Sequence, residues 1–227
     1  MREMALWGQH IDEYQQMFGL SGSDINSRLL EYACGATAVN AQLHARGQTV
    51  ISCDPLFSLD KSHLERAVQS MFDEAVRHLN TNPEQYDFSY HGSFTSLMAK
   101  RREGISKCLA DYDLGRMEKR YLSLEHDALP FEDFSFDFAL SSHFLFASIE
   151  EQDVDFHLQC IRELARVAKE VRIFPLIDEN GQPSPVLGPV LLGLQQANYG
   201  VEVRKVDYQL QFGGHAMLRV WALECQV

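Results

Sequence analysis

Short hydrophobic runs alternate with helical patterns along most of the chain, and this alternation constrains the fold more than any other feature of the sequence. Two parallel strands need a long crossover between them, usually a helix, whereas antiparallel strands can follow each other through a short turn. The alternation therefore predicts an α/β fold whose mostly parallel sheet carries helices on both faces. In chain order, the strands predicted for the parallel part cover residues 28–32, 49–53, 120–124, 136–141 and 170–174.

The two ends of the chain extend this pattern. Two β-rich runs, 201–206 and 217–223, flank a Gly-Gly loop and predict an antiparallel final strand in a sheet of seven. An amphipathic N-terminal helix over residues 5–18 is predicted because apolar residues recur there at helical spacing, namely Trp7, Ile11, Tyr14 and Phe18.

A long segment, about residues 61–118, separates the second and third predicted strands and exceeds what a strand connection requires. Its helical patterns predict an insertion over one end of the sheet, which could shape a substrate pocket or serve only as a packing element. Basic residues gather between Lys100 and Arg120. We interpret them as a solvated helix face, with a local basic patch as the alternative.

Composition limits the class of protein. With 227 residues, 45% of them hydrophobic, the chain can bury the core of one domain, 1–227. No apolar run reaches the roughly 20 residues of a membrane span, and the first residues lack a signal-peptide core. We therefore expect a cytoplasmic protein with no membrane partner, as a monomer or homodimer. The five scattered cysteines predict reduced thiols and no metal site, and the net charge of −12 argues against a nucleic-acid partner.

The first predicted strand ends in the small residues Ala33, Cys34 and Gly35, ahead of a helix. Small side chains at such a turn let a ligand approach the backbone, and the crevice outside the carboxyl ends of the strands is the expected ligand site. A dinucleotide usually needs several glycines at this turn, where only Gly35 is present. S-Adenosylmethionine has no phosphate, so that demand does not apply to it.

Two acidic residues follow the next strands. Asp54 closes the second strand, where an ionised carboxylate can accept hydrogen bonds from both hydroxyls of a ribose. Asp127 follows the third strand, and its carboxylate could accept from an adenine amino group while the amide of Ala128 donates to a ring nitrogen. Taken alone, each acidic residue is equally typical of an ordinary turn.

In order and spacing, these motifs resemble the cofactor motifs of class I S-adenosylmethionine-dependent methyltransferases. The residues concerned are Glu31-Tyr32-Ala33-Cys34-Gly35, Asp54, and the segment Asp127-Ala128-Leu129-Pro130-Phe131 with Ser135-Phe136-Asp137 after it. The closer likeness is to uncharacterised bacterial methyltransferase-like proteins, through residues 136–146 and 171–176. The resemblance implies a Rossmann-like methyltransferase fold, with a seven-stranded sheet and a helical insertion between the second and third strands.

The resemblance also implies the site. Glu31 would lie near the methionine amino group, Asp54 would hold the ribose, Leu56 would cover the adenine, and Ser141 would lie beside the methionine part. The full set of implied cofactor-binding residues is Glu31, Tyr32, Ala33, Cys34, Gly35, Asp54, Pro55, Leu56, Asp127, Ala128 and Ser141. The sequence departs from the family pattern at Ala33 and Thr37, where the family usually has glycine.

Methyl transfer needs mainly alignment of the acceptor with the methyl carbon. If the acceptor must lose a proton, His143 is the candidate base, because its ordinary pKa suits neutral pH; the alternative is a histidine packed among aromatic neighbours. His91, with Tyr86 and Tyr90, could shape the acceptor pocket. An Asn-Pro-Pro-Tyr motif is absent after the fourth strand, so we expect a small molecule or a protein side chain as acceptor. Two alternatives are a catalytically inactive cofactor-binding regulatory module and a nicotinamide-dependent oxidoreductase.

Overall fold

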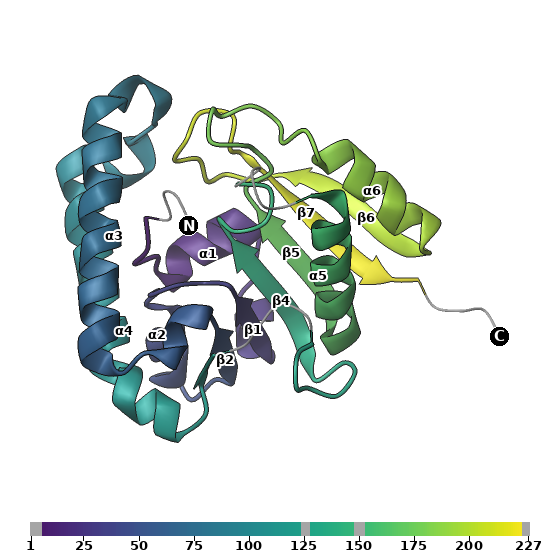
Figure 1. Ribbon diagram of the computed structural model, residues 1–227, viewed down its shortest axis with the longest axis horizontal. Helices are drawn as coiled ribbons and strands as arrows, with labels where there is room; N and C mark the ends of the chain where they lie inside the picture. Colours follow the sequence, from purple (N-terminus) through teal and green to yellow (C-terminus); the bar gives the residue numbers. More distant parts are fainter. Residues whose placement is uncertain (1–5, 124–127, 148–152, 224–227) are drawn as a thin grey trace.

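A computed structural model describes residues 6–123, 128–147 and 153–223, and its centre is one seven-stranded sheet (Figure 1). The strand order is β3-β2-β1-β4-β5-β7-β6, and β7 runs antiparallel to both of its neighbours. This arrangement confirms the predicted Rossmann-like methyltransferase fold. The strands are β1 (Leu29–Tyr32), β2 (Val50–Cys53), β3 (Tyr121–Leu122), β4 (Phe136–Ser142), β5 (Ala168–Phe174), β6 (Tyr199–Lys205) and β7 (Ala216–Ala222).

Helices cover both faces of the sheet, as the alternation predicts (Figure 1). One face packs against α5 (Val154–Val167) and α6 (Leu187–Gln196), and the other packs against α1 (Ile11–Phe18) and α2 (Val39–His44). On α5 the buried stripe recurs every three or four residues, which is the period of a helix with one core-facing side. Among the described residues, no helix is both long and apolar enough to span a membrane.

The helical insertion consists of α3 (Lys61–Thr81) and α4 (Phe94–Met117), two long helices between β2 and β3. They lie side by side at the end of the sheet formed by β3 and β2 (Figure 1). Asp60 caps α3 by accepting a hydrogen bond from the amide of His63, and Ser93 caps α4 in the same way at Ser96. The predicted insertion between the second and third strands is therefore confirmed.

The basic residues of the insertion differ from the prediction. Arg101 is completely buried and Arg120 is only 7% exposed, so the interpretation of this region as a solvated helix face is wrong for both residues. Arg101 forms an ion pair with Glu13 at 2.6 Å. Arg120 forms a two-pronged pair with Asp111, at 2.7 and 2.8 Å. Each guanidinium is buried because a carboxylate from a packed neighbour satisfies it.

A buried polar network joins the insertion to the rest of the molecule. Glu13 on α1 binds Arg101 on α4, and Tyr208, in the loop between β6 and β7, accepts a hydrogen bond from Arg101 at 3.1 Å. His91 lies 3.4 Å from Glu13 and 3.3 Å from the Tyr208 hydroxyl. Three parts of the chain far apart in sequence, α1, the insertion and the loop between β6 and β7, are thus fixed to one another by charged and polar contacts.

The N-terminal helix is shorter than predicted, because it begins at Ile11 rather than near Ala5. The residues before it, Leu6–His10, form an extended segment that we call the N-terminal segment. Gly8 in this segment has a positive φ of 92°, which ends any helical continuation there. Ala5 lies outside the described residues, and Trp7 belongs to the N-terminal segment although its spacing matches the helix.

Candidate functional site

The carboxyl ends of β1, β2 and β4 meet at one edge of the sheet. β1 lies between β2 and β4, so the chain leaves β1 toward one side of the sheet and later returns on the other. The crevice at such a reversal of strand order is where open α/β sheets bind ligands. The register places Glu31 beside Ser52 and Tyr32 beside Ser141, which aligns the three strand ends.

The turn after β1 is held by the end of β2. Ala33 and Gly35 both have positive φ, 53° and 64°. The amide of Ala33 donates to the carbonyl of Cys53 at 2.8 Å, and the amide of Gly35 donates to the carboxylate of Asp54 at 2.7 Å. Asp54 also accepts from the amide of Leu56 at 3.0 Å. Asp54 therefore fixes the shape of this turn and of its own loop together.

Glu31 lies beneath the same turn and is fully buried. Its carboxylate accepts hydrogen bonds from the hydroxyls of Thr37, at 2.8 Å, and Ser52. The phenol of Tyr14 joins Glu31 to Ser142 at the end of β4. Burial raises the pKa of Glu31, although hydrogen bonds from Ser52, Thr37 and Tyr14 oppose that rise. Glu31 and Asp54 are thus brought to neighbouring strand ends and support one turn.

Two other predicted residues turn their side chains into the core. The hydroxyl of Tyr32 lies 3.3 Å from Cys160 on α5, and its ring packs edge-to-face against Phe144. The thiol of Cys34 is buried, and burial raises its pKa well above the ordinary range. Both residues contribute their backbone to the turn, whereas their side chains pack in the core on the two faces of the sheet.

Trp7 covers the turn, and the sequence does not reveal this. A methyl group on the α-carbon of Gly35 would overlap the indole of Trp7, so the close approach and the positive φ both require glycine at that position. Trp7 is 4% exposed and packs in a cluster with Cys34, Ala36 and Phe57. The glycines at positions 8 and 35 lie where this segment makes close contacts, but the sequence does not say which residue each glycine contacts.

The structure describes all but one of the remaining residues that are predicted to bind the adenosyl group. Pro55 and Ala128 are exposed, and Leu56 is half-buried in the loop after β2. Asp127 lies outside the described residues. The predicted convergence of three acidic side chains on one ligand therefore stays a prediction as far as Asp127 is concerned.

At the end of β4, Ser141 and His143 have distinct settings. The hydroxyl of Ser141 is buried and has no hydrogen-bond partner within the described part of the chain. His143 has a positive φ of 54°, and its amide donates to the carbonyl of Phe174 at 2.7 Å. Its Nδ1 forms a hydrogen bond of 2.6 Å with the hydroxyl of Ser142. Burial, helped by the positive charge of Arg101, lowers the pKa of His143 to about 4, so the ring is neutral at pH 7.

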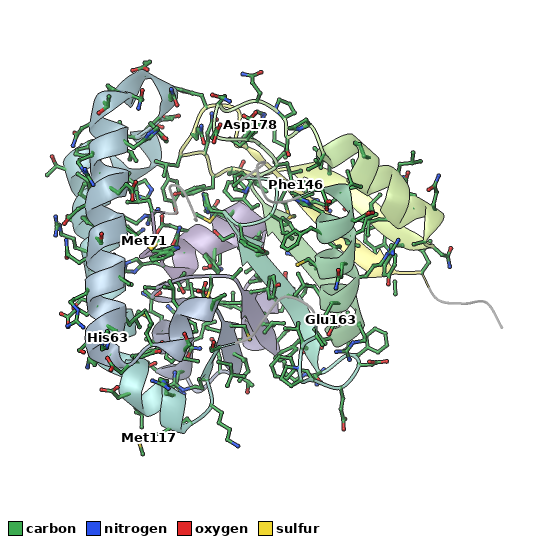
Figure 2. The ribbon with its side chains drawn as sticks, viewed as in Figure 1. His63, Met71, Met117, Phe146, Glu163 and Asp178 are labelled. Carbon is green, nitrogen blue, oxygen red and sulfur yellow. The ribbon has the colours of Figure 1, made fainter. Side chains whose placement is uncertain are left out.

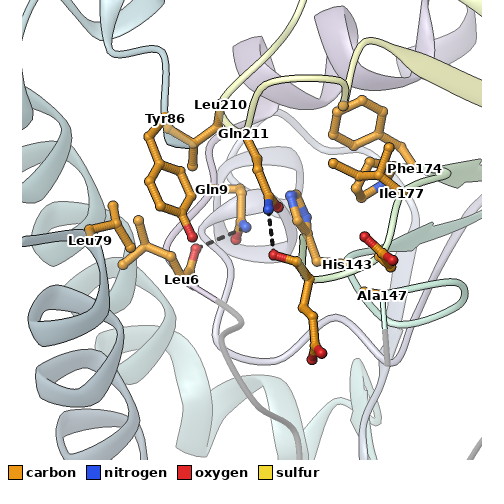
Figure 3. A pocket seen from close by; sticks show the side chains of 14 residues that line it. Leu6, Gln9, Leu79, Tyr86, His143, Ala147, Phe174, Ile177, Leu210 and Gln211 are labelled. Carbon is orange, nitrogen blue, oxygen red and sulfur yellow. Dashed lines mark hydrogen bonds between the residues drawn. The ribbon is translucent and has the colours of Figure 1, made fainter. Parts of the chain in front are cut away.

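His143 lines a pocket at the carboxyl ends of β4 and β5 (Figure 3). Asp178 in the loop after β5 lies at the same end of the sheet as Phe146 in the loop after β4, whereas Glu163 on α5 lies toward the opposite end (Figure 2). Tyr86 from the insertion also lines the pocket. Of the three insertion residues considered from sequence, His91 belongs instead to the buried network, and Tyr90 is 37% exposed.

Comparisons with known proteins place the chain among distant relatives. No protein-family model matches it. It is similar to an uncharacterised protein of Methanocaldococcus jannaschii, with 25% identity over 219 residues that cover 96% of each chain. The likeness inferred from the sequence was to bacterial proteins, whereas this relative is archaeal.

Two of the solved structures to which the chain is similar are SAM-dependent methyltransferases. One is a TehB-like SAM-dependent methyltransferase from Corynebacterium glutamicum, at 14% identity and a TM-score of 0.46, covering 88% of this chain and 81% of that one. The other is a SAM-dependent methyltransferase from Methanosarcina mazei, at 14% identity and a TM-score of 0.44, covering 88% of this chain and 94% of that one. The fold assignment rests on the sheet order and strand directions, not on these similarities.

Proposed function

We propose that this protein is an S-adenosylmethionine-dependent methyltransferase whose acceptor is a small molecule or a protein side chain. The observation that carries the proposal is the 2.7 Å hydrogen bond from the amide of Gly35 to Asp54. It joins the small-residue turn after β1 to an acidic residue at the end of β2, at the reversal of strand order where a nucleoside ligand is expected.

The residues at this edge fit the cofactor. The turn offers a single glycine and no phosphate cradle, which suits a ligand without phosphate. Asp54 supplies the type of acceptor that ribose hydroxyls need. The buried hydroxyl of Ser141 has no partner in the described residues, and a polar group of the methionine part would satisfy it.

We assign to these residues the roles that the family resemblance implies. Glu31 would lie near the methionine amino group and keep the turn in shape through Thr37 and Ser52. Asp127 and Ala128 would bind the adenine edge, as the sequence resemblance implies. Leu56, in the loop that Asp54 caps, would cover the adenine ring.

When bound, S-adenosylmethionine would supply a methyl group on a positively charged sulfur, and transfer of that group leaves a thioether. The protein's own residues then have to hold the acceptor in line and keep water away. His143 would accept the acceptor's proton, because its ring lines the pocket beside the β4 end and is unprotonated at pH 7. The sequence prediction assumed an ordinary pKa, and the lowered pKa makes His143 a weaker base than that prediction implied.

Calorimetric titration of the full chain with S-adenosylmethionine, with its demethylated product and with NAD tests this proposal. We expect binding of the first two and none of NAD. Asp54→Asn should lose about tenfold or more in affinity, since a hydrogen bond to a charged group is worth about 1.5–3 kcal/mol. Asp60→Asn is the matched control, because Asp60 also accepts from a backbone amide but lies at the exposed start of α3. A folded protein that binds neither sulfur compound at millimolar concentration contradicts the proposal.

A catalytically inactive cofactor-binding module is a second candidate, favoured by the indole of Trp7 against Gly35 and by Ala33 and Thr37 at family glycine positions. The two candidates differ in turnover. Formation of the demethylated product with any member of an acceptor library supports the enzyme, whereas tight cofactor binding without product across the library supports the module.

A further inference from the structure

The pocket beside His143 is apolar on most of its wall. Its apolar side chains come from the N-terminal segment, the insertion, β5 and its following loop, and the loop between β6 and β7, namely Leu6, Leu79, Tyr86, Phe174, Ile177 and Leu210. A lining of this kind, mostly apolar with a few polar groups, is typical of a site for a small organic molecule.

A buried hydrogen-bond acceptor in this wall has no partner. Gln9 is 4% exposed, and its Nε2 donates to the carbonyl of Leu6 at 3.0 Å, while its Oε1 is buried without a hydrogen bond in the described structure. Figure 3 shows the Gln9 side chain between Tyr86 and His143. An unsatisfied buried acceptor is costly, so a ligand that donates a hydrogen bond there would be bound preferentially.

The charges around the pocket have one sign. The charged side chains among the described lining residues are Asp178 and Glu179, and none of those residues is lysine or arginine. The carboxylate of Asp178 already accepts from the amides of Asn180 and Gln182, and Glu179 is exposed at the mouth. His143 in the wall is neutral. A cationic ligand is therefore attracted, and an anionic one is repelled.

We propose that this pocket holds the methyl acceptor and that the acceptor is a small apolar or aromatic amine, recognised by the Oε1 of Gln9 and by the carboxylates at the mouth. This inference rests on the proposed methyltransferase function. The bound ammonium would first lose one proton, to His143 and then to water, which exposes the nitrogen lone pair. The nitrogen would then form its bond to the methyl carbon as the carbon–sulfur bond breaks, giving an N-methylammonium product and the thioether.

Ligand-observed NMR on the full chain without cofactor tests the recognition step, with 2-phenylethylamine, 3-phenylpropionate and 2-phenylethanol as probes of matched size. We expect the amine to bind and the carboxylate not to bind. Gln9→Leu should weaken amine binding about tenfold, because it removes the acceptor and keeps the volume. Gln195→Leu makes the same change on the exposed face of α6 and should leave binding unchanged.

Glu179→Lys keeps the inference testable if Gln9→Leu fails to fold, since Glu179 is exposed. Glu179→Lys should weaken binding of the amine and strengthen binding of the carboxylate. Glu132→Lys, in an exposed loop before β4, should change neither. Equal binding of amine and carboxylate, or amine binding indifferent to both Gln9→Leu and Glu179→Lys, overturns the inference. Because no cofactor is present, such a result is separate from a failed calorimetric titration with S-adenosylmethionine.

Discussion

His91 and His143 are held without charge in the folded protein. Burial lowers the pKa of both His91 and His143 to about 4. Glu13 opposes this effect at each histidine, and Arg101 adds to it. In the unfolded chain each ring titrates near its ordinary value of about 6.5. The folded protein therefore binds fewer protons than the unfolded chain between these two values.

This difference predicts a pH dependence of stability with a defined sign. As pH falls from about 6.5 to about 4, the unfolded chain takes up protons that the folded one does not, so the free energy of unfolding decreases. His91→Gln or His143→Gln should each remove part of that decrease, on the order of 1 kcal/mol. Urea unfolding at several pH values measures it.

His215→Gln, at an exposed histidine between β6 and β7, is the control and should leave the slope of stability against pH as it is. The explanation fails if the variants of the buried histidines and of His215 show the same slope.

Residue chemistry also explains which parts of the site the sequence predicts. Small residues after a strand and an acidic residue after the next strand depend on local order, so Gly35 and Asp54 could be placed at one edge from the pattern alone. The partners of Glu31 could not, because Tyr14 reaches the carboxylate only through the packing of α1 against the sheet, and Ser52 only through the register of β2 beside β1. Gln9 belongs to no sequence pattern that would indicate a binding residue.

For whole helices and strands, the period at which hydrophobic residues recur decides which elements can be predicted from the sequence. The predicted strands that became β1, β2, β4 and β5 lie within a few residues of their observed bounds, because their buried faces are mostly apolar. The buried face of α4 breaks this rule. It includes Arg101, Gly104 and Gly115 beside apolar residues, so burial recurs at helical spacing without a hydrophobic stripe.

The crossing of the N-terminal segment over α4 explains the glycines in that face. A methyl group on Gly104 would overlap the carbonyl of Gly8, and one on Gly8 would overlap the carbonyl of Arg101. The two backbones pack directly against each other. This contact fixes the N-terminal segment against the insertion, and the ion pair of Lys100 with Asp12 at 2.6 Å joins α1 to the same helix.

Gly104→Ala should therefore destabilise the protein by about 1–3 kcal/mol, the usual cost of overpacking. Gly188→Ala is the matched control, because Gly188 lies in α6 and a methyl group there would meet nothing within 4 Å. At that open helical position alanine should be neutral or stabilise by up to about 1 kcal/mol. Urea denaturation of both variants decides the matter, and effects of the same sign and size would contradict the packing explanation.

Considered as a whole, the molecule separates its candidate site from the antiparallel edge of the sheet. Glu31, Asp54 and Ser141 gather at the carboxyl ends of β1, β2 and β4, where the N-terminal segment and the insertion pack over the turn after β1. At the far edge, β6 and β7 pair antiparallel, and β6 is only partly buried. The buried network through Glu13 and Arg101 joins the closing elements to the loop between β6 and β7.

This separation predicts where a ligand slows amide hydrogen exchange. The demethylated cofactor should protect residues 33–37, 54–58 and 141–146, and it should leave the β6 and β7 amides unchanged, because local opening at the far edge does not involve the ligand. Exchange measured by mass spectrometry, with NAD as the control ligand, tests this. Protection centred on β6 and β7 would place the ligand somewhere other than the proposed site.

Because Trp7 packs against the turn after β1, its fluorescence reports on the surroundings of that turn. The chain has two tryptophans, and the second, Trp221, lies on β7 at the opposite side of the sheet. Any molecule that reaches Gly35 changes the surroundings of one indole and leaves the other as an internal reference. Intrinsic fluorescence can therefore follow arrival at the turn in real time without a label, and Trp7→Phe isolates the reference signal.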